Sequence, residues 1–399
     1  MTLIPTRTAS RTAAAVGALA VSALALTSCS SAESTTPSTT STAAAAESGS
    51  ALDLASVCPE TVVMQQDWQP EAEHGAMYNL VGDGYTVDTE AKTVTGPLVV
   101  NGTDTGVDIE VRSGGPAVGY SPVPELMYLD EDILIGAVNT DAAIVAQAER
   151  PTVAVTSQLT YSPQILMWDP ESHPGATTIA EAASEGAAVV TSGDVIPNLL
   201  LSQGIITEDQ IDTSYEGTPN RFVSDPTILQ QGFATAEPYI YENEISQWGK
   251  PVSYQLLSDV GYSIYPEPLA VRADDVTEEA DCLAKLVPIM QQSQLDFLSA
   301  PEHGVAVILD LVEQYNTGWT YSQGVADFSV QQQNELGIVI DDEASGVFGQ
   351  FDPDRVASIV TDFTPFLVTA GNISQEAADA IDPTSLYTNE FIDTSISRG

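Results

Sequence analysis

Short apolar runs alternate with amphipathic stretches along much of the chain. Runs typical of buried strands fall at 61–66, 107–112, 133–138, 153–158 and 187–191. Helical patterns lie between them, and this alternation indicates an α/β protein with largely parallel sheets. The stretch from Tyr85 to Thr105 differs, because VTGPLVV followed by Asn101-Gly102 predicts an added β-hairpin on the surface.

The later chain has a helical pattern. We expect helices at 278–298, 305–315 and 353–370. Pro288 should kink the first helix, and Pro365 is a candidate break in the last. No internal repeat of 20 to 50 residues is visible, which argues against a solenoid or a propeller.

The N-terminus carries a targeting pattern. Arg7 and Arg11 precede an apolar run at 13–26, which ends in Leu-Thr-Ser-Cys29. This matches a lipoprotein signal over residues 1–28, and the run is shorter than the roughly 20 apolar residues of a membrane-spanning anchor. We therefore expect cleavage before Cys29 and a lipid on its thiol, which would hold the protein on the outer face of the cytoplasmic membrane.

Residues 29–51 are rich in Ser, Thr and Ala and have no apolar face, so they predict a flexible linker. Folded structure should begin near Leu52. The roughly 340 residues that remain are too many for one ordinary core and suit two lobes.

The charge is strongly acidic, with 56 Asp and Glu against 11 Lys and Arg. This balance excludes nucleic acid as a partner. The acidic residues are scattered along the chain, as expected of a solvated surface.

Two cysteines remain beside Cys29. Cys58 and Cys282 can pair in an oxidising compartment or stay as two separate buried thiols. A disulfide between them would close a loop of more than 200 residues and stabilise the fold by roughly 4 to 5 kcal/mol.

The first strand ends in a candidate binding segment. Trp68 follows the strand, and helical spacing places Glu71, His74 and Tyr78 on one face, opposite an apolar face. An indole, a carboxylate, an imidazole and a phenol suit a planar, hydrogen-bonding ligand. In the alternative interpretation, Trp68 belongs to the core and neighbours satisfy the polar groups.

This segment resembles a known family. The run W-x-P-x-x-x-H-x-x-x-Y at Trp68, Pro70, His74 and Tyr78 is similar to type II solute-binding proteins of ABC importers that are related to thiamine-pyrimidine synthases. Members bind hydroxymethylpyrimidine or formylaminopyrimidine. The chain departs from the family at Gly75-Ala76, where members usually have Ala-Gly.

The resemblance implies a two-lobed type II periplasmic-binding-protein fold with a cleft between the lobes. Lobe 1 would contain 52–153 and 263–399, and lobe 2 would contain 154–262, so that two crossing strands form the hinge. It also implies a small-molecule ligand and ABC permease subunits as partners. We expect a monomer.

Further segments resemble the family more thinly. Ser113 and Gly114 begin a glycine loop, Asn139 and Asp141 follow a strand, and 386–392 is similar to the closing segment of many members. Glycines let backbone amides approach a ligand at a helix start. Asn139 and Asp141 are also good helix caps, and capping is the alternative role for at least one of them.

In lobe 2 the resemblance points to Ser192, Glu237 and Tyr239. A carboxylate at Glu71 or Glu237 could pair with the amine and ring nitrogen of an aminopyrimidine, while Trp68 or Tyr239 stacks on the ring. The alternatives are a helix cap for Ser192 and a turn residue beside a core tyrosine for Glu237.

Two other binding functions stay open. The ligand could be a small anion such as a sulfonate, nitrate or an organic acid, which would need arginines in the cleft. The candidates are Arg112, Arg150, Arg221 and Arg272. The chain could also be a sensor lipoprotein that transports nothing.

Catalysis is the remaining alternative, because synthases of this fold use pyridoxal phosphate. The chain has no lysine near the first strand and lacks the cysteine-rich motif of those synthases. H-E-x-x-H, G-x-S-x-G and phosphate-loop signatures are also missing from the sequence. We therefore expect a binding protein with no enzymatic activity, no cofactor and no metal.

Overall fold

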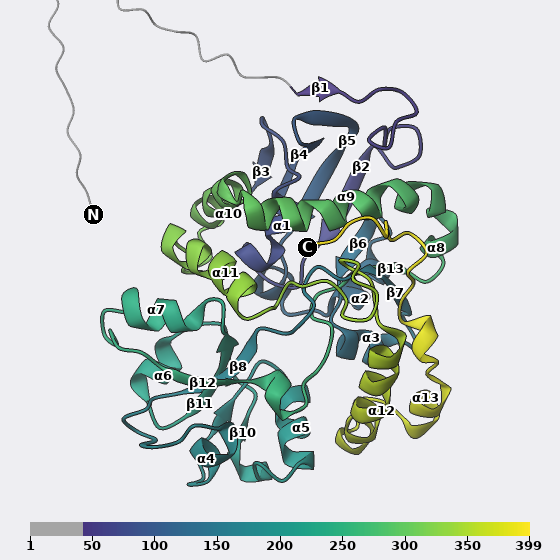
Figure 1. The fold of residues 1–399 in the computed structure, drawn as a ribbon. Helices are drawn as coiled ribbons and strands as arrows, with labels where there is room; N and C mark the ends of the chain where they lie inside the picture. The colour runs from purple at the N-terminus through teal and green to yellow at the C-terminus, as the bar shows by residue number, and fades with distance from the viewer. Residues whose placement is uncertain (1–42) are drawn as a thin grey trace, which may run out of the picture. The chain divides into compact units, whose positions relative to one another are not determined.

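The computed structural model describes residues 43–399, which form two β-sheets with helices packed around them (Figure 1). The predicted signal sequence 1–28 and Cys29 lie outside these residues. Among the described helices, none has the length and apolar character needed to cross a membrane.

The first sheet contains eight strands in the order β3-β4-β5-β2-β6-β13-β7, with β1 paired to β5 off this path. These strands are β1 (Ala44–Ala45), β2 (Thr61–Gln65), β3 (Thr86–Asp88), β4 (Thr93–Val100), β5 (Thr103–Arg112), β6 (Ile133–Ala137), β7 (Thr152–Thr156) and β13 (Leu269–Arg272). Strands β5, β2 and β6 are parallel, so their carboxyl ends meet at one edge.

The second sheet has five strands in the order β10-β9-β11-β8-β12. They are β8 (Gln164–Trp168), β9 (Val189–Val190), β10 (Ile211–Asp212), β11 (Leu229–Phe233) and β12 (Ser253–Leu256). Strands β10, β9 and β11 are parallel, whereas β8 is antiparallel to both β11 and β12. Parallel pairing joins β1, β5, β2 and β6 in the first sheet, and β10, β9 and β11 in the second. The prediction of largely parallel sheets is therefore only partly correct, because β4, β13 and β8 each run antiparallel to both of their neighbours.

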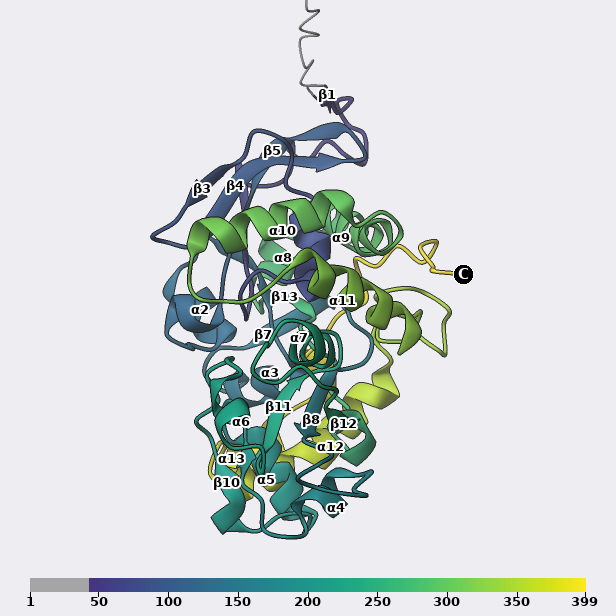
Figure 2. The ribbon, with the colours of Figure 1, turned by 90° about the vertical axis from the view of Figure 1, so that its left-hand side faces the viewer.

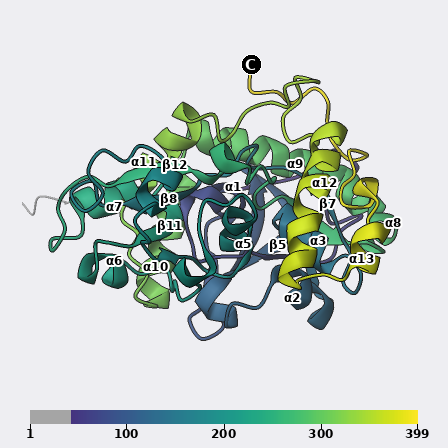
Figure 3. The same cartoon turned by 90° about the horizontal axis from the view of Figure 1, so that it is seen from below.

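Helices pack around both sheets. They are α1 (Gly75–Tyr78), α2 (Val123–Leu129), α3 (Thr140–Ala146), α4 (Ile179–Ala183), α5 (Val195–Ser202), α6 (Asn220–Ser224), α7 (Glu237–Asn243), α8 (Asp275–Glu278), α9 (Ala280–Ser299), α10 (Glu302–Tyr315), α11 (Gln323–Glu335), α12 (Pro353–Ala370) and α13 (Gln375–Ala380). Short 3₁₀ helices η1 (Ala72–His74) and η2 (Gly115–Val118) precede α1 and α2. Helix α12 contacts both α3 and α5 (Figure 3).

Helix α12 begins and ends where the sequence predicts, but Pro365 does not break it. A proline inside a helix removes one backbone hydrogen bond. Here Phe363, Phe366 and Leu367 are buried next to it, and this apolar packing keeps the helix continuous.

The predicted hairpin is present, and the prediction that it only decorates the surface is wrong. Strands β4 and β5 pair around Asn101-Gly102, whose positive φ angles of 49° and 78° suit a tight hairpin turn. Strand β5 continues into the predicted run at 107–112 and pairs with β2. The hairpin therefore extends the first sheet by β4 and β3 (Figure 2).

The end of the predicted linker is also ordered. Ala44 and Ala45 form β1, and the amide of Ala44 donates to the carbonyl of Gly102 at 3.1 Å. The short side chains of these two alanines allow pairing with the open edge of β5. Regular structure therefore begins before the predicted position near Leu52.

Two connections join the sheets. The chain leaves the first sheet between β7 and β8 and returns between β12 and β13. The predicted lobe boundaries near residues 153 and 263 fall in or beside these connections, and they stay a prediction. Two connecting segments are the usual geometry of a hinge.

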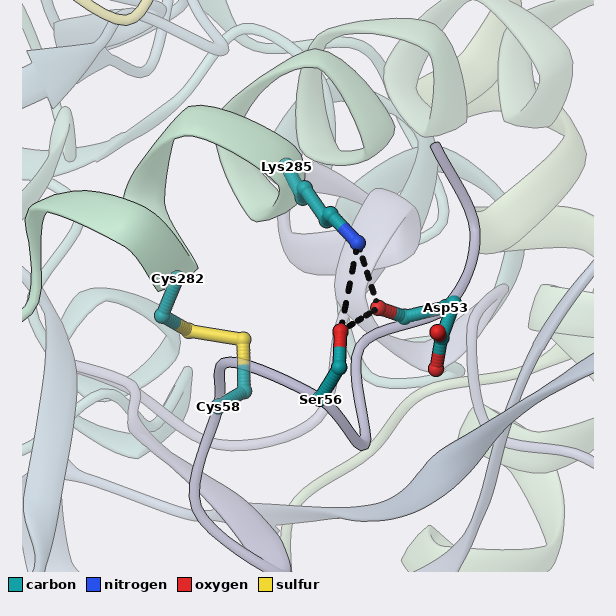
Figure 4. The surroundings of a disulfide bond; sticks show 5 residues. All are labelled: Asp53, Ser56, Cys58, Cys282 and Lys285. Carbon is teal, nitrogen blue, oxygen red and sulfur yellow. Dashed lines mark hydrogen bonds between the residues drawn. A yellow bond between two sulfur atoms is a disulfide. The ribbon is translucent and has the colours of Figure 1, made fainter. Parts of the chain in front are cut away.

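A disulfide joins Cys58, just before β2, to Cys282 in α9 (Figure 4). Lys285, one turn further along α9, donates to the carbonyl of Asp53 at 2.7 Å and to that of Ser50 at 3.1 Å. The start of the fold is therefore fixed to a late helix by one covalent bond and one lysine.

We expect the Cys58→Ala/Cys282→Ala double variant to unfold with a free energy lower by about 5 kcal/mol, because the disulfide closes a loop with a sequence separation of 224. Urea unfolding followed by circular dichroism measures this change. A Lys285→Met variant, which keeps the aliphatic stem, should lose much less. An unchanged free energy in the double variant would contradict the prediction.

Candidate functional site

Two neighbouring cavities share a wall where the strand ends of the two sheets meet. A main compartment of about 590 Å³ and a second compartment of about 280 Å³ share Asp67, Trp68, Asn139, Ser192 and Tyr215 in their walls. Parallel strands deliver loops at their carboxyl ends, where ligands bind in open α/β sheets. Asp67 and Trp68 follow β2, Asn139 follows β6 and Ser192 follows β9.

A third compartment of about 200 Å³ adjoins the others at Tyr215. Its walls include Glu237, Tyr241 and Trp319. The three compartments together are called the cleft below.

Aromatic rings cluster around Trp68. Its ring centroid lies 6.0 Å from that of Tyr120 and 6.3 Å from that of Trp319, in tilted and edge-on arrangements. Backbone also approaches this ring, because a Cβ on Gly115 would lie 2.8 Å from it. Trp68 is only partly buried and lines two compartments.

Close backbone approaches hold Trp68 in place. A Cβ on Gly114 would lie 2.3 Å from the carbonyl oxygen of Gln66, so this position requires glycine. The Gly114 amide donates to the carbonyl of Trp68 at 2.7 Å, and that of Gly115 donates to the carbonyl of Asp67 at 2.9 Å. These two amides of the predicted glycine loop therefore donate to the neighbouring loop and not to a ligand.

His74 lies between two carboxylates. Its Nε2 is 3.1 Å from Oδ1 of Asp67 and 3.1 Å from Oε2 of Glu267. His74 and Glu267 are buried, whereas the Asp67 side chain is 24% exposed. Asp67 and Glu267 line the second compartment, and His74 lies behind them.

Burial would lower the pKa of His74, but Glu267 and Asp67 outweigh burial and raise it well above its usual value. Burial and the charge of Asp67 raise the pKa of Glu267. The cluster therefore holds a proton more tightly than free side chains would.

Asn139 connects the two acidic residues. Its Nδ2 donates to Oδ2 of Asp67 at 3.1 Å, and its Oδ1 accepts from the amide of Glu267 at 3.0 Å. Asn139 precedes α3, but its side chain does not cap that helix. Asp141 lines the second compartment, and its carboxylate accepts from Tyr262 at 2.8 Å. Burial raises the pKa of Asp141.

Ser192 and Glu237 are the predicted lobe 2 residues that line the cleft, and both are already hydrogen bonded. The amide of Ser192 donates to Oε1 of Gln231 at 2.8 Å, and Ser192 does not cap α5. Glu237 accepts from Tyr215 at 3.2 Å and from the amide of Phe233 at 2.6 Å. Burial raises the pKa of Glu237 to about 7.

Other predicted site residues do not line any of the three compartments. Glu71 is buried, and Tyr78 lies in the core cluster of the first sheet. Ser113 is buried, and its carbonyl accepts from Gln65 at 3.1 Å. Tyr239 packs on Phe328 of α11 with a centroid separation of 5.5 Å.

No basic side chain lines the cleft among residues 43–399. The four candidate arginines pair elsewhere with acidic residues, namely Arg112 with Glu110 and Asp130, Arg150 with Glu149, Arg221 with Asp212, and Arg272 with Asp275. The cleft walls instead carry Asp67, Asp141, Asp194, Glu216, Glu237 and Glu267.

Sequence reasoning missed several cleft residues. Asp67 stands directly before Trp68 at a strand end, and that position was a usable signal. Glu267 and Tyr215 come from loops without a recognisable pattern, although Glu267 has a left-handed φ of 50°, which is unusual outside glycine. Pro266 and Pro268 on either side of Glu267 signal an irregular loop, but not the contact with His74.

No family model matches the chain, and no curated protein matches it. Among solved structures, a protein from Bordetella bronchiseptica RB50 is 12% identical, with a TM-score of 0.52 over 84% of this chain and 96% of that one. The ligand-binding component of an ABC-type import system from Staphylococcus aureus, solved with zinc bound, is 12% identical, with a TM-score of 0.50 over 86% of this chain and 100% of that one. The predicted two-lobed fold of solute-binding proteins is confirmed by these similarities.

We expect the stability of the protein to fall as pH rises from 5 to 8, in part through Glu237. Its folded pKa of about 7 exceeds the ordinary value of 4.5, so the folded state binds more protons across this window and loses stability as pH rises. Glu73, Tyr215 and Tyr241 face the same carboxyl group.

The variant Glu237→Gln removes this contribution. We compare the unfolding free energy of the variant with that of the original protein by urea unfolding at pH 5 and at pH 8. The variant minus original difference should be about 2 to 3 kcal/mol larger at pH 8 than at pH 5. Glu216→Gln, which removes an exposed charge from the same cleft, serves as the control. Equal pH dependence in all three proteins would refute the assignment.

Proposed function

We propose that the protein is the extracytoplasmic solute-binding component of an ABC importer, and that it captures a small planar heterocycle carrying an amine, such as a pyrimidine precursor of thiamine. One observation carries this proposal. The cleft combines aromatic rings with carboxylates and contains no basic side chain among the described residues.

The two kinds of wall serve different parts of such a ligand. Trp68 and Tyr215 offer ring faces to a flat heterocycle, and carboxylates accept hydrogen bonds from amine and protonated ring-nitrogen groups. Asp67 stands next to Trp68 and is partly exposed, so its carboxylate can be reached from the main compartment. Lobe closure would then exclude water from these bonds.

A small anion is the second candidate, and the cleft disfavours it. A sulfonate or nitrate needs donors, and arginine is the usual one. All four candidate arginines are paired with acidic residues away from the cleft. An anion in this cleft would meet six carboxylates and only neutral donors.

Binding is also favoured over catalysis. A Schiff base with pyridoxal phosphate needs a lysine in the site. The three lysines of the chain lie outside the cleft. Lys92 donates to the carbonyl of Tyr315, Lys250 binds Asp169, and Lys285 binds the carbonyl of Asp53.

The proposal includes a lipid anchor at Cys29, with the residues before it removed and the permease subunits as partners. The disulfide between Cys58 and Cys282 supports an extracytoplasmic location, because disulfides persist in oxidising compartments. The acidic surface supports solubility there.

We expect hydroxymethylpyrimidine to raise the thermal midpoint of the full chain purified in detergent, whereas methanesulfonate and nitrate should not. A ligand at about 100 times its dissociation constant adds roughly 2.7 kcal/mol to stability. Trp68→Ala should abolish the shift, because it removes the stacking surface.

Tyr128→Ala is the matched control, since Tyr128 is an exposed aromatic residue of α2 that does not line the cleft. It should keep the full shift. A shift with sulfonates or nitrate alone would overturn the proposal and establish the anion alternative.

A further inference from the structure

Three side chains from separate segments converge beside the second compartment. Asp67 lies in the loop after β2, His74 ends η1, and Glu267 lies in the loop before β13. One ligand atom from each lies within 4.8 Å of the other two. An imidazole nitrogen and two carboxylate oxygens are therefore directed at one small volume.

Two of the three separations fit donors that share one metal ion. Two donor atoms that each lie about 2.1 Å from a metal are about 3.0 to 3.4 Å apart when they occupy neighbouring positions. Nε2 of His74 is 3.1 Å from an oxygen of Asp67 and 3.1 Å from an oxygen of Glu267. Only small movements of the side chains would be needed to hold an ion.

One of these donors has no hydrogen bond. Oε2 of Glu267 is buried and accepts no hydrogen bond from residues 43–399. It lies 3.1 Å from the same His74 nitrogen that Asp67 also contacts. A single proton on that nitrogen cannot serve both carboxylates well, and a buried acceptor without a partner is costly.

Charge balance gives a second argument. No Lys or Arg of the described chain forms an ion pair with Asp67 or Glu267, and the buried carboxylates of Glu71 and Glu73 lie close enough to affect the same cluster. An imidazolium neutralises one of the two carboxylates that contact it, whereas a divalent cation neutralises both.

Asn139 supplies an outer shell for the two carboxylates, whereas the buried Nδ1 of His74 has no hydrogen-bond partner among residues 43–399. Asn139 donates to the other oxygen of Asp67 and accepts from the backbone of Glu267. Polar partners of this kind orient the ligands in known metal sites.

We propose that Asp67, His74 and Glu267 bind a divalent transition-metal ion of the Mn²⁺, Fe²⁺ or Zn²⁺ class in the wall of the second compartment. One imidazole and two carboxylates suit these ions. Asp67 and Glu267 both line the compartment, so the remaining coordination positions face the cleft. The inference goes beyond the proposed organic ligand and does not depend on it.

The test uses the full chain in detergent, freed of metal with a chelator and titrated separately with MnCl₂ and ZnCl₂. Calorimetry gives the affinity and stoichiometry, and electron paramagnetic resonance counts unbound Mn²⁺. We expect one ion per chain. Glu267→Gln, which is nearly isosteric, and His74→Gln should each weaken binding at least about tenfold.

Asp194→Asn is the matched control, because it removes one charge from the same compartment without touching the three ligands. It should bind as the original protein does. Circular dichroism verifies the fold of each variant, and Glu267→Gln alone decides the matter if His74→Gln fails to fold.

Two results would overturn the metal site. One is no binding of either ion at micromolar concentrations. The other is equal weakening by Glu267→Gln and Asp194→Asn, which would mean diffuse attraction by acidic groups. Because no organic solute is present, failure of the proposed pyrimidine ligand would leave this result unaffected.

Discussion

Buried negative charge is the constraint on which the site depends. Five carboxyl groups are almost fully buried near the place where the two sheets meet, namely Glu71, Glu73, Asp141, Glu237 and Glu267. A buried carboxylate is stable only when it is protonated, hydrogen bonded or paired with a cation. The described chain supplies hydrogen bonds and one imidazole there, but no lysine or arginine. The cleft is therefore suited to positively charged or amine-bearing solutes.

Topology brings these groups together. Parallel strands of both sheets direct their carboxyl ends toward the cleft, and the double crossing of the chain adds the loop that carries Glu267. Trp68 follows β2 of the first sheet, yet a Cβ on Gly217, which follows β10, would lie 2.8 Å from its ring. Residues far apart in sequence thus form one wall, and relative motion of the lobes would change it.

The sequence predicts much of this fold because its signals are local. Alternating apolar runs locate β2, β5, β6, β7 and β9, and Asn101-Gly102 locates a turn. Trp68, Asn139 and Ser192 fall at strand ends that line the cleft. The runs do not locate most strands of the second sheet, nor β13. The prediction that Glu71 and Tyr78 share a ligand-facing side of a helix is not met, and the reason is physical. A 3₁₀ turn and a four-residue helix are buried on all sides, so this segment has no exposed face. Glu267 meets His74 through tertiary contact alone, which no local pattern encodes.

The central claim is that the cleft selects amine-bearing planar solutes by aromatic stacking and carboxylate hydrogen bonds. The most direct measurement is mass spectrometry of the small molecule released by denaturing protein purified from cells. We expect an amine-bearing planar heterocycle, at about one per chain in a fully loaded preparation. A sulfonate or another anion released in the same amount would contradict it.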